Sequence, residues 1–339
     1  MVKKTNLKTI ARDLGLSVGT VSRVLNGKAK EYRISDQTVD LVLKYASESG
    51  YTPNLIAKGL RDSKTYTIGL VIPDIANPFF SIMAKNIEKA ASIANYSIIL
   101  VDAEENIERE KHQIKNMISR KVDGIIAAPV GTTFEHFNEI LQAEIPLIFV
   151  DRYIKDSSVT YIASDNFMGG YNATNHLISK GHSKIGLIKG SEIIEPVKER
   201  RQGYLKALEE AGIKPDRSLI EGKAFSIESG YESTVKLLKL PEPPTALFAM
   251  SNVIGLGVLK ALKEYKYAVP EDISLIIFDD QPYVSYLNPP ITTIKQNSKK
   301  IGEIAIEYIL QLMNDLHTPL TSRLIPTEII FRDSVLDIK

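Results

Sequence analysis

The stretch YTIGLVIP at residues 66–73, with the helical pattern at 78–94 behind it, decides the fold of most of this chain. Its apolar run lacks strict alternation, which is typical of a strand buried on both faces of a parallel sheet. The same strand-and-helix unit recurs, with strands predicted at 96–102, 122–129 and 146–150 and helices at 106–120 and 133–142. The repeat predicts an α/β lobe around a doubly wound parallel sheet.

A second set of such units follows Thr160 and predicts a second lobe of the same kind. Its strands are expected near 160–164, 184–190, 219–224, 245–250 and 274–279, and its helices at 167–180, 197–211, 227–239 and 252–265. The helical pattern at 298–314 predicts that the chain then returns to the first lobe. Two lobes joined by several crossovers form a cleft at the carboxyl ends of their strands, which suits a small ligand.

The composition excludes several classes of protein. With 339 residues the chain has material for two or three structural units, and no apolar run reaches the ~18 residues that a membrane span requires. The absence of Cys excludes disulfides, a thiolate nucleophile and Cys-ligated metal sites. No continuous apolar stretch follows the basic N-terminus, so we expect no secretory signal, no membrane association and a cytoplasmic location.

The charge is unevenly distributed along the chain. Residues 1–64 hold 12 Lys and Arg against 6 Asp and Glu, a net +6, whereas the remainder holds 30 against 35, a net −5. A basic head on an acidic body is typical of a nucleic-acid-binding module joined to a soluble sensor, although a solvated basic face gives the same imbalance.

The stretch LKTIARDLGLSVGTVSRVLN at 7–26 predicts two short helices joined by a tight turn. Asn6 is placed to cap the first helix, Gly15 ends it, and Ser17 is placed to cap the second. Apolar residues at helical spacing, Leu7, Ile10, Ala11 and Leu14 in the first helix and Val21, Val24 and Leu25 in the second, are expected to face inward. The pattern predicts a helix-turn-helix, which binds DNA in many proteins and protein in others.

The outward face of the second helix has few large side chains, so its N-terminal end is suited to a close approach to base edges in the major groove. Arg23 is expected to reach a guanine or a phosphate. The residues predicted to contact DNA from this helix and its caps are Ser17, Val18, Gly19, Thr20, Ser22, Arg23 and Asn26.

Six motifs, in order along almost the whole chain, resemble the lactose repressor/galactose repressor (LacI/GalR) family of transcriptional regulators. They are TVSRVLN at 20–26, GYTPNLIAKGLR at 50–61, TIGLVIPDIANPFF at 67–80, HLISKGHSKIGLIKG at 176–190, DD at 279–280 and PPITTIKQ at 289–296. The resemblance implies a DNA-binding headpiece (1–52), a hinge helix (53–63) and an effector-binding core (64–339) of two lobes of the periplasmic-binding-protein type. The implied lobes are about 66–163 plus 297–325 and about 164–294 plus 326–339.

The segment PNLIAKGLR at 53–61 resembles the hinge helix of that family. Nine residues are fewer than the ~12–15 that an isolated helix needs in water, so the segment is expected to order only against a second copy and DNA. The resemblance places Asn54, Ala57, Leu60 and Arg61 at the minor groove, with Leu60 as the wedge that kinks the duplex. Packing of Leu60 on the core is the alternative.

The segment GKAKEYRI at 27–34 departs from the family by about three additional residues. Lys28 or Lys30 could contact a phosphate. A solvated loop without a role in binding is the alternative, and the sequence favours it.

The resemblance also implies the residues that contact a small-molecule effector. They are Phe79 and Phe80 at the opening of a helix, Asp151 after PLIFV, Arg200 in RRQGY, Ser251, Asp279 in FDD and Gln296 in TTIKQ. A guanidinium grips a hydroxyl pair or a carboxylate, and an aromatic ring stacks on a sugar. A salt-bridge role for Arg200 and a core role for Phe80 are the structural alternatives.

The stretch SNVIGLG at 251–257 differs from the N-D-x-x-A-x-G pattern of many family members, because Ser251 replaces an amide and Asn252 a carboxylate. The effector of a well-known member therefore does not carry over to this chain. The set of Asp151, Arg200 and Asp279 favours a sugar or a sugar acid.

No catalytic constellation is present. The five His residues, at 112, 136, 176, 182 and 317, are scattered, and the chain has no H-E-x-x-H, G-x-S-x-G or Walker-type motif. We expect neither an enzyme nor a metal or cofactor site. A sugar-binding transport component is the rival interpretation, and the headpiece with no signal peptide argues against it.

The mechanism implied by the resemblance is a homodimer that binds a near-palindromic operator, with effector binding changing the closure of the cleft and thereby the hinge helices. We expect a repressor that the effector releases from DNA.

Overall fold

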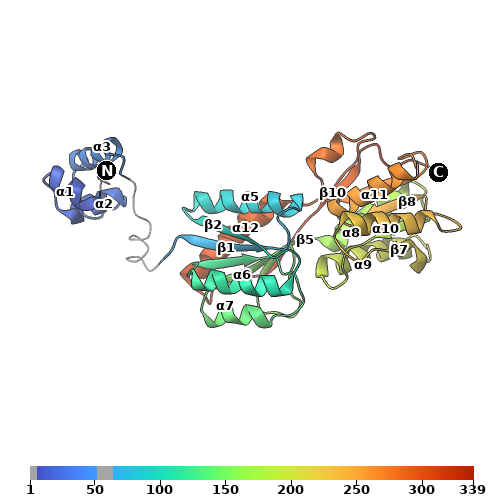
Figure 1. Cartoon of the computed structure of the whole chain (residues 1–339), viewed down its shortest axis with the longest axis horizontal. Helices are drawn as coiled ribbons and strands as arrows, with labels where there is room; N and C mark the ends of the chain where they lie inside the picture. Colours follow the sequence, from blue (N-terminus) through green and yellow to red (C-terminus); the bar gives the residue numbers. More distant parts are fainter. Residues whose placement is uncertain (1–5, 52–63) are drawn as a thin grey trace. The chain divides into compact units, whose positions relative to one another are not determined.

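The chain divides into two units, Met1–Thr65 and Tyr66–Lys339, and the computed structural model describes residues 6–51 and 64–339 (Figure 1). The first unit contains the predicted helix-turn-helix. The second contains two six-stranded sheets, each covered by helices on both faces.

Over residues 6–51, the first unit packs three helices around a small apolar core. The helices are α1 (Leu7–Asp13), α2 (Val18–Leu25) and α3 (Asp36–Glu48). Asn6 caps α1 by accepting a hydrogen bond from Thr9 N (3.0 Å), and Gly15 turns the chain at φ +65°, a conformation that glycine adopts without strain. The buried core residues are Ile10, Ala11, Val21, Val24, Val42 and Ala46. The predicted helix-turn-helix and its inward-facing residues are confirmed.

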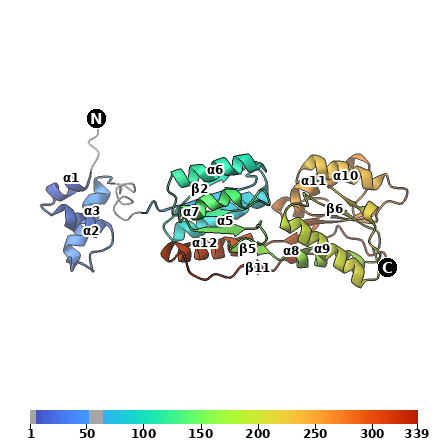
Figure 2. The ribbon, with the colours of Figure 1, turned by 90° about the horizontal axis from the view of Figure 1, so that it is seen from below.

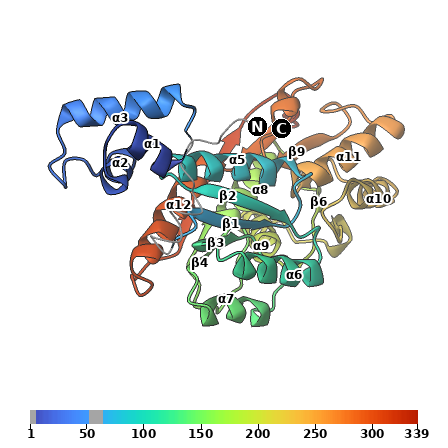
Figure 3. The same cartoon turned by 60° about the vertical axis from the view of Figure 1, so that its left-hand side comes forward.

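The first lobe of the second unit is a fully parallel sheet in the order β11-β5-β4-β3-β1-β2. Figure 3 shows its middle strands side by side, with α5 on one face and α6 and α7 on the other. Its elements are β1 (Thr67–Ile72), α5 (Pro78–Ile93), β2 (Ser97–Asp102), α6 (Ile107–Ser119), β3 (Gly124–Ala127), α7 (Asn138–Gln142), β4 (Leu147–Val150), β5 (Tyr161–Ser164), α12 (Ser298–Asn314) and β11 (Arg323–Ile325).

The second lobe repeats this plan in the order β12-β10-β9-β8-β6-β7, with only β12 antiparallel. Figure 2 shows α8 and α9 along one face of the sheet and α10 and α11 along the other. Its elements are α8 (Asn166–Ser179), β6 (Ile185–Ile188), α9 (Glu195–Glu210), β7 (Ile220–Glu221), α10 (Ile227–Leu238), β8 (Ala246–Ala249), α11 (Asn252–Glu264), β9 (Ser274–Phe278), β10 (Thr292–Lys295) and β12 (Glu328–Ile330).

The central strands are buried on both faces of the sheet, which explains why their sequences are apolar without alternation. Along β1, Ile68, Leu70 and Ile72 pack on the side of α5 and α12, while Val71 packs on the side of α6. The long helix α12 lies against α5, so the predicted return of the chain to the first lobe is confirmed. Among the described helices, none is both long and apolar enough to span a bilayer.

The structure corrects three details of the sequence-based prediction. The strand at 160–164 was assigned to the second set, but as β5 it pairs with β4 in the first sheet. The helix expected over 133–142 is a 3₁₀ turn, Glu135–Phe137, followed by the short α7. Strands β10, β11 and β12 were not predicted, because each spans only three or four residues and lacks a long apolar run.

Two glycines bring α8 and α9 into close contact. A Cβ added at Gly170 would lie 2.2 Å from the carbonyl oxygen of Arg200, and one added at Gly203 would lie 2.1 Å from the carbonyl oxygen of Phe167. Only glycine permits this approach of two helix backbones. The contact fixes the position of Arg200 on α9.

Candidate functional site

The first candidate surface is the N-terminal end of α2. Ser17 caps this helix by accepting a hydrogen bond from Thr20 N (3.0 Å), and the hydroxyls of the two residues lie 2.9 Å apart. Val18 and Gly19 follow on the exposed surface. The helix therefore presents a cap and small side chains to solvent, which leaves room for a close approach of DNA.

The other residues of α2 that are predicted to contact DNA differ in their contacts within the headpiece. The amide Nδ2 of Asn26 donates to the carbonyl oxygen of Ser22 (2.6 Å) and lies 3.3 Å from its hydroxyl, so Asn26 closes the end of α2. Arg23 is exposed, and its guanidinium lies over the ring of Tyr32, 3.9 Å from the ring centroid. Lys28 and Lys30, the possible phosphate contacts, are also exposed.

The predicted hinge, including Asn54, Ala57, Leu60 and Arg61, lies outside the residues that the structure describes. Its assignment to the minor groove remains a prediction.

The second candidate site is a cavity in the two-lobed unit. All seven residues predicted to contact an effector line this one cavity: Phe79, Phe80, Asp151, Arg200, Ser251, Asp279 and Gln296. We call it the inner cavity. Its volume is about 20 Å³, the space of about one water molecule. The lobes therefore lie close together around a set of polar side chains.

Arg200 is the buried cation of the inner cavity. Its Nε donates to Asn166 Oδ1 (2.8 Å), its Nη1 donates to the carbonyl oxygen of Met250 (2.5 Å), and the guanidinium lies 3.5 Å from the centroid of the Phe278 ring. Burial lowers the pKa of Arg200, while Asp279 and Asp151 oppose that shift. The side chain is held in one orientation by contacts on three sides.

Two aspartates face this cation, each at the end of a strand. Asp151 follows β4 and Asp279 follows β9, and both have a left-handed backbone, with φ of 60° and 79°. Such conformations are strained for residues other than glycine and often occur at binding sites. Burial raises the pKa of both carboxyls, to about 6 for Asp151, and Arg200 opposes the shift in each.

The two carboxylates differ in their hydrogen bonds. Asp279 accepts from Gln296 Nε2 (2.6 Å) and from the backbone N of Asn252 (3.2 Å), and Gln296 accepts from the hydroxyl of Ser164. The Oδ1 atom of Asp151 is buried and has no hydrogen-bond partner among the described residues. Asp151 is therefore the carboxylate whose oxygen is left for a ligand donor.

Two side-chain hydrogen bonds join the lobes near this network. In one, the hydroxyl of Tyr153, in the first lobe, donates to Glu199 Oε1 on α9 (2.6 Å). In the other, Asn252 Nδ2, at the start of α11, donates to Asn77 Oδ1 (3.2 Å), which also accepts from Phe79 N (3.1 Å) as the cap of α5. Both amides are buried. We call this contact the Asn77–Asn252 bridge. A carboxylate at position 252 would have no donor for this bond, so the amide of Asn252 is what permits it.

The aromatic residues and Ser251 contribute mainly through packing and capping. Phe79 and Phe80 are 7% and 2% exposed, so both belong to the core of the first lobe as well as to the wall of the cavity. Ser251 Oγ caps α11 by accepting from Ile254 N (3.2 Å). Phe80 is therefore both a core residue of the first lobe and a residue of the cavity wall, so the two alternatives for it are compatible.

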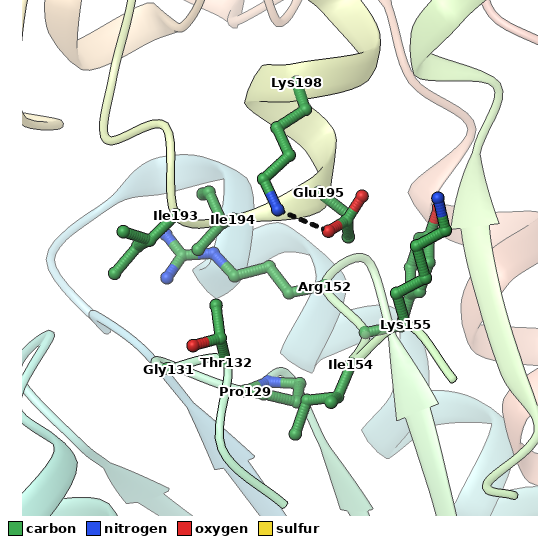
Figure 4. Close-up of a pocket in the computed structure, with 11 residues that line it drawn as sticks. Pro129, Gly131, Thr132, Arg152, Ile154, Lys155, Ile193, Ile194, Glu195 and Lys198 are labelled. Carbon is green, nitrogen blue, oxygen red and sulfur yellow. Dashed lines mark hydrogen bonds and ion pairs between the residues drawn. The ribbon is translucent and has the colours of Figure 1, made fainter. Parts of the chain in front are cut away.

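A second pocket lies beside the inner cavity and shares Arg152 and Ile194 with it (Figure 4). We call it the outer pocket, and its volume is about 150 Å³. Arg152 makes a bidentate ion pair with Glu105 (2.6 and 2.7 Å), and Lys198 pairs with Glu195 (2.6 Å). Polar side chains thus continue from the inner cavity toward solvent.

The prediction missed several polar residues in and around the cavity. Arg152, which lines it, follows β4. Asn166, which accepts from Arg200, follows β5, and Asn252, whose backbone N donates to Asp279, begins α11 just after β8. Each is at the carboxyl end of a parallel strand, the edge where α/β proteins bind ligands, so this rule could have identified them. Phe225 also lines the cavity, and no sequence pattern marks it.

Comparison with known families assigns both units. Residues 6–54 match the model described as bacterial regulatory proteins, lacI family, and residues 174–335 match the periplasmic binding protein-like domain. The chain is 32% identical to catabolite control protein A of Priestia megaterium over 96% of this chain and 97% of that protein. This chain belongs to the lacI family. The resemblance inferred from the six motifs is confirmed.

Two solved structures of lacI-family type resemble almost the whole chain. A Lac repressor dimer bound to operator and the anti-inducer ONPF has a TM-score of 0.85 at 26% identity, and covers 98% of this chain and 100% of that one. A complex of the transcriptional regulator CelR with cellobiose has a TM-score of 0.74 at 27% identity, and covers 97% of this chain and 99% of that one. The relatives are transcriptional regulators and not enzymes, so the predicted fold class and the non-enzymatic assignment are confirmed.

Proposed function

We propose that this lacI-family regulator is a repressor that binds a near-palindromic operator as a homodimer, and that a sugar or sugar acid in the inner cavity controls this binding. Residues 1–52 form the DNA-binding headpiece, 53–63 the hinge, and 64–339 the effector-binding and dimerisation core of a cytoplasmic protein. Within the core, the lobes comprise about 66–163 plus 297–325 and about 164–294 plus 326–339.

The observation that carries the proposal is that both lobes contribute charged side chains to one buried cavity. Asp151 comes from the first lobe and has an unpaired oxygen, while Arg200 and Asp279 come from the second. A polyol offers hydroxyl donors to Asp151 and acceptors to Arg200, so it satisfies both kinds of group at once. An unpaired buried carboxylate oxygen is otherwise costly.

The small volume of the inner cavity suggests how effector binding is coupled to DNA binding. A space of about 20 Å³ does not admit a sugar, so an effector enters only when the lobes or their side chains move. We expect this movement to change the spacing of the two hinge segments in a dimer. A coupling of ~1–3 kcal/mol between the sites gives a 5- to 150-fold change in operator affinity.

The headpiece supports operator binding. The exposed start of α2 and the net charge of +6 in residues 1–64 suit the major groove and its phosphates. The Lac repressor structure contains operator DNA and the CelR structure contains cellobiose, which supports the same two classes of partner here.

A thermal-shift screen of neutral sugars, aldonic acids and uronic acids tests the effector, because a ligand that binds the native state raises the melting temperature. Asp151→Asn is the matched variant, and we expect it to abolish the shift. A compound that stabilises both proteins equally binds elsewhere, which contradicts the assignment of the inner cavity.

In vitro selection from random DNA with the full-length protein tests operator binding. We expect enrichment of a near-palindrome, and weaker gel-shift binding when the effector from the screen is added. No enrichment contradicts the proposed function, and tighter binding with the effector reverses the proposed direction of control. Leu60→Ala is expected to weaken operator binding while leaving the thermal shift unchanged.

A further inference from the structure

The segment 27–34 is a folded turn held by α2, which we call the recognition helix because the proposed function places it in the major groove. Lys28 N donates to the carbonyl oxygen of Arg23 (2.9 Å), and Ile34 N donates to the carbonyl oxygen of Ala29 (2.9 Å). Ala29 and Ile34 also pack, partly buried, against the headpiece core. We call this segment the α2–α3 turn. Its backbone position is therefore fixed relative to α2, unlike that of a solvated loop.

The turn places one aromatic ring beside the recognition helix. Tyr32, which is 44% exposed, lies under the guanidinium of Arg23, with a distance of 3.9 Å from the guanidinium carbon to the ring centroid. A cation at this distance from the face of an aromatic ring is attracted by the ring. The two side chains are the only aromatic–cation pair in the described part of the headpiece.

Stacking leaves the hydrogen-bonding edge of Arg23 available. No hydrogen bond or ion pair engages its guanidinium among residues 6–51 and 64–339. The five N–H donors lie in the plane of the group, whereas the ring occupies only one face. A guanidinium stacked in this way can make an edge-on bidentate contact with O6 and N7 of guanine without leaving the ring.

We propose that Tyr32 is a positioning residue that holds Arg23 for the reading of one base pair, and that this is the role of the α2–α3 turn. The inference rests on the proposed function, since it requires that α2 contacts operator DNA. An arginine that is already oriented loses less side-chain entropy on binding than a free one. The ring therefore increases both affinity and selectivity at the base pair that Arg23 reads.

The test uses full-length protein and the operator that the wild type selects from random DNA. Gel shifts compare Tyr32→Ala, Tyr32→Phe, Arg23→Ala and the double variant Arg23→Ala/Tyr32→Ala. We expect Tyr32→Ala to weaken operator binding about two- to fivefold, the factor that corresponds to an exposed cation–π contact. Tyr32→Phe retains the ring and is expected to bind as the wild type does.

Two further readouts separate positioning from a general structural effect. Tyr32→Ala should lose selectivity only at the base pair where Arg23→Ala loses it, and should add nothing to the loss in the double variant. Lys30→Ala in the same turn is the matched control, and is expected to change the salt dependence without changing selectivity.

The contrary outcomes are distinct from one another. Equal losses for Tyr32→Phe and Tyr32→Ala indicate that the hydroxyl contacts a phosphate, which overturns the inference. An additive double variant, or wild-type binding by Tyr32→Ala, also overturns it. If the wild type enriches no sequence, the proposed function itself fails. Circular dichroism of each variant confirms that the headpiece is folded.

Discussion

The headpiece and the cleft each hold an arginine against an aromatic ring, but the two arginines are constrained in different ways. Arg23 lies on exposed Tyr32 and makes no other polar contact with a described residue, whereas Arg200 lies on buried Phe278 and donates to Asn166 and a carbonyl oxygen. The guanidinium of Arg200 is buried and depends on partners within the protein, whereas that of Arg23 is exposed and has water. We expect changes at Arg200 to affect stability as well as binding, and changes at Arg23 to affect binding alone.

The largest effect is expected from Arg200→Met. This substitution keeps much of the side-chain volume but removes the larger of two counter-charges near Asp151 and the one cation near Asp279. Leaving buried carboxylates uncompensated in this way costs about 3–5 kcal/mol. Urea unfolding of the full-length chain followed by circular dichroism should show a loss of this size, together with loss of the effector-induced thermal shift.

Arg201→Met is the control for Arg200→Met, because Arg201 is the next residue on α9 and is 40% exposed in its side chain. We expect its loss to be below about 1 kcal/mol. Equal losses in the two variants would show that Arg200 is no more constrained than the partly exposed Arg201.

The second effect concerns the pH dependence of stability. Burial raises the pKa of Asp151 from 3.8 to about 6, so the folded protein takes up this proton before the unfolded chain does. The contribution of Asp151 to the free energy of unfolding is therefore most favourable below pH 4. It declines as the pH rises to about 6, by about 3 kcal/mol in total.

Comparison of the wild type with Asp151→Asn across pH 4–7 isolates this contribution. The variant is expected to become the more stable of the two, by a margin that grows from pH 4 to about 6 and is then constant. A margin independent of pH would mean that Asp151 is already paired in the folded protein.

The residues that line the cleft could be predicted from the sequence, whereas the contacts between the lobes that close it could not. The residues after β4 and β9 are set by strand ends, which apolar runs and the family motifs locate, so Asp151 and Asp279 were both identified. The Asn77–Asn252 bridge depends on how two lobes meet, and no local pattern encodes that distance. Likewise, β10 and β12 are short strands that owe their pairing to neighbours already in the sheet.

In the headpiece the course of the backbone could be predicted from the sequence, but the contact between two side chains could not. The capping residues and the helical period predicted α1, α2 and the turn between them. They did not predict the contact between Arg23 and Tyr32, because the conformation of the α2–α3 turn depends on Ala29 and Ile34 packing against the core.

The third largest effect is expected in the headpiece, from a change at Arg23. Arg23→Lys keeps the charge but loses the planar fork that makes a bidentate contact with guanine. We expect a loss of about 1–3 kcal/mol in discrimination at one base pair of the selected operator, with no change in melting temperature. Gel shifts with single-base operator variants measure it. Undiminished selectivity would indicate that Arg23 contacts a phosphate.

The smallest effect is expected from Asn252→Ala, which removes the donor of the Asn77–Asn252 bridge. The cost is modest, about 0.5–1.5 kcal/mol, because Asn77 Oδ1 keeps its bond to Phe79 N. A loss of this size at the meeting point of the lobes should shift the chain toward open forms in which the inner cavity is larger.

The absence of cysteine allows this shift to be measured directly, since a pair of spin labels can be placed without background. Labels at Cys substitutions of the exposed residues Lys89 on α5 and Lys263 on α11 report the distance between the lobes. We expect Asn252→Ala to broaden the distance distribution toward longer values, and Asn252→Asp to do so further, because its carboxylate adds repulsion beside Asp279. Identical distributions in the wild type and Asn252→Ala would show that other contacts, such as the hydrogen bond from Tyr153 to Glu199, hold the lobes together without the bridge.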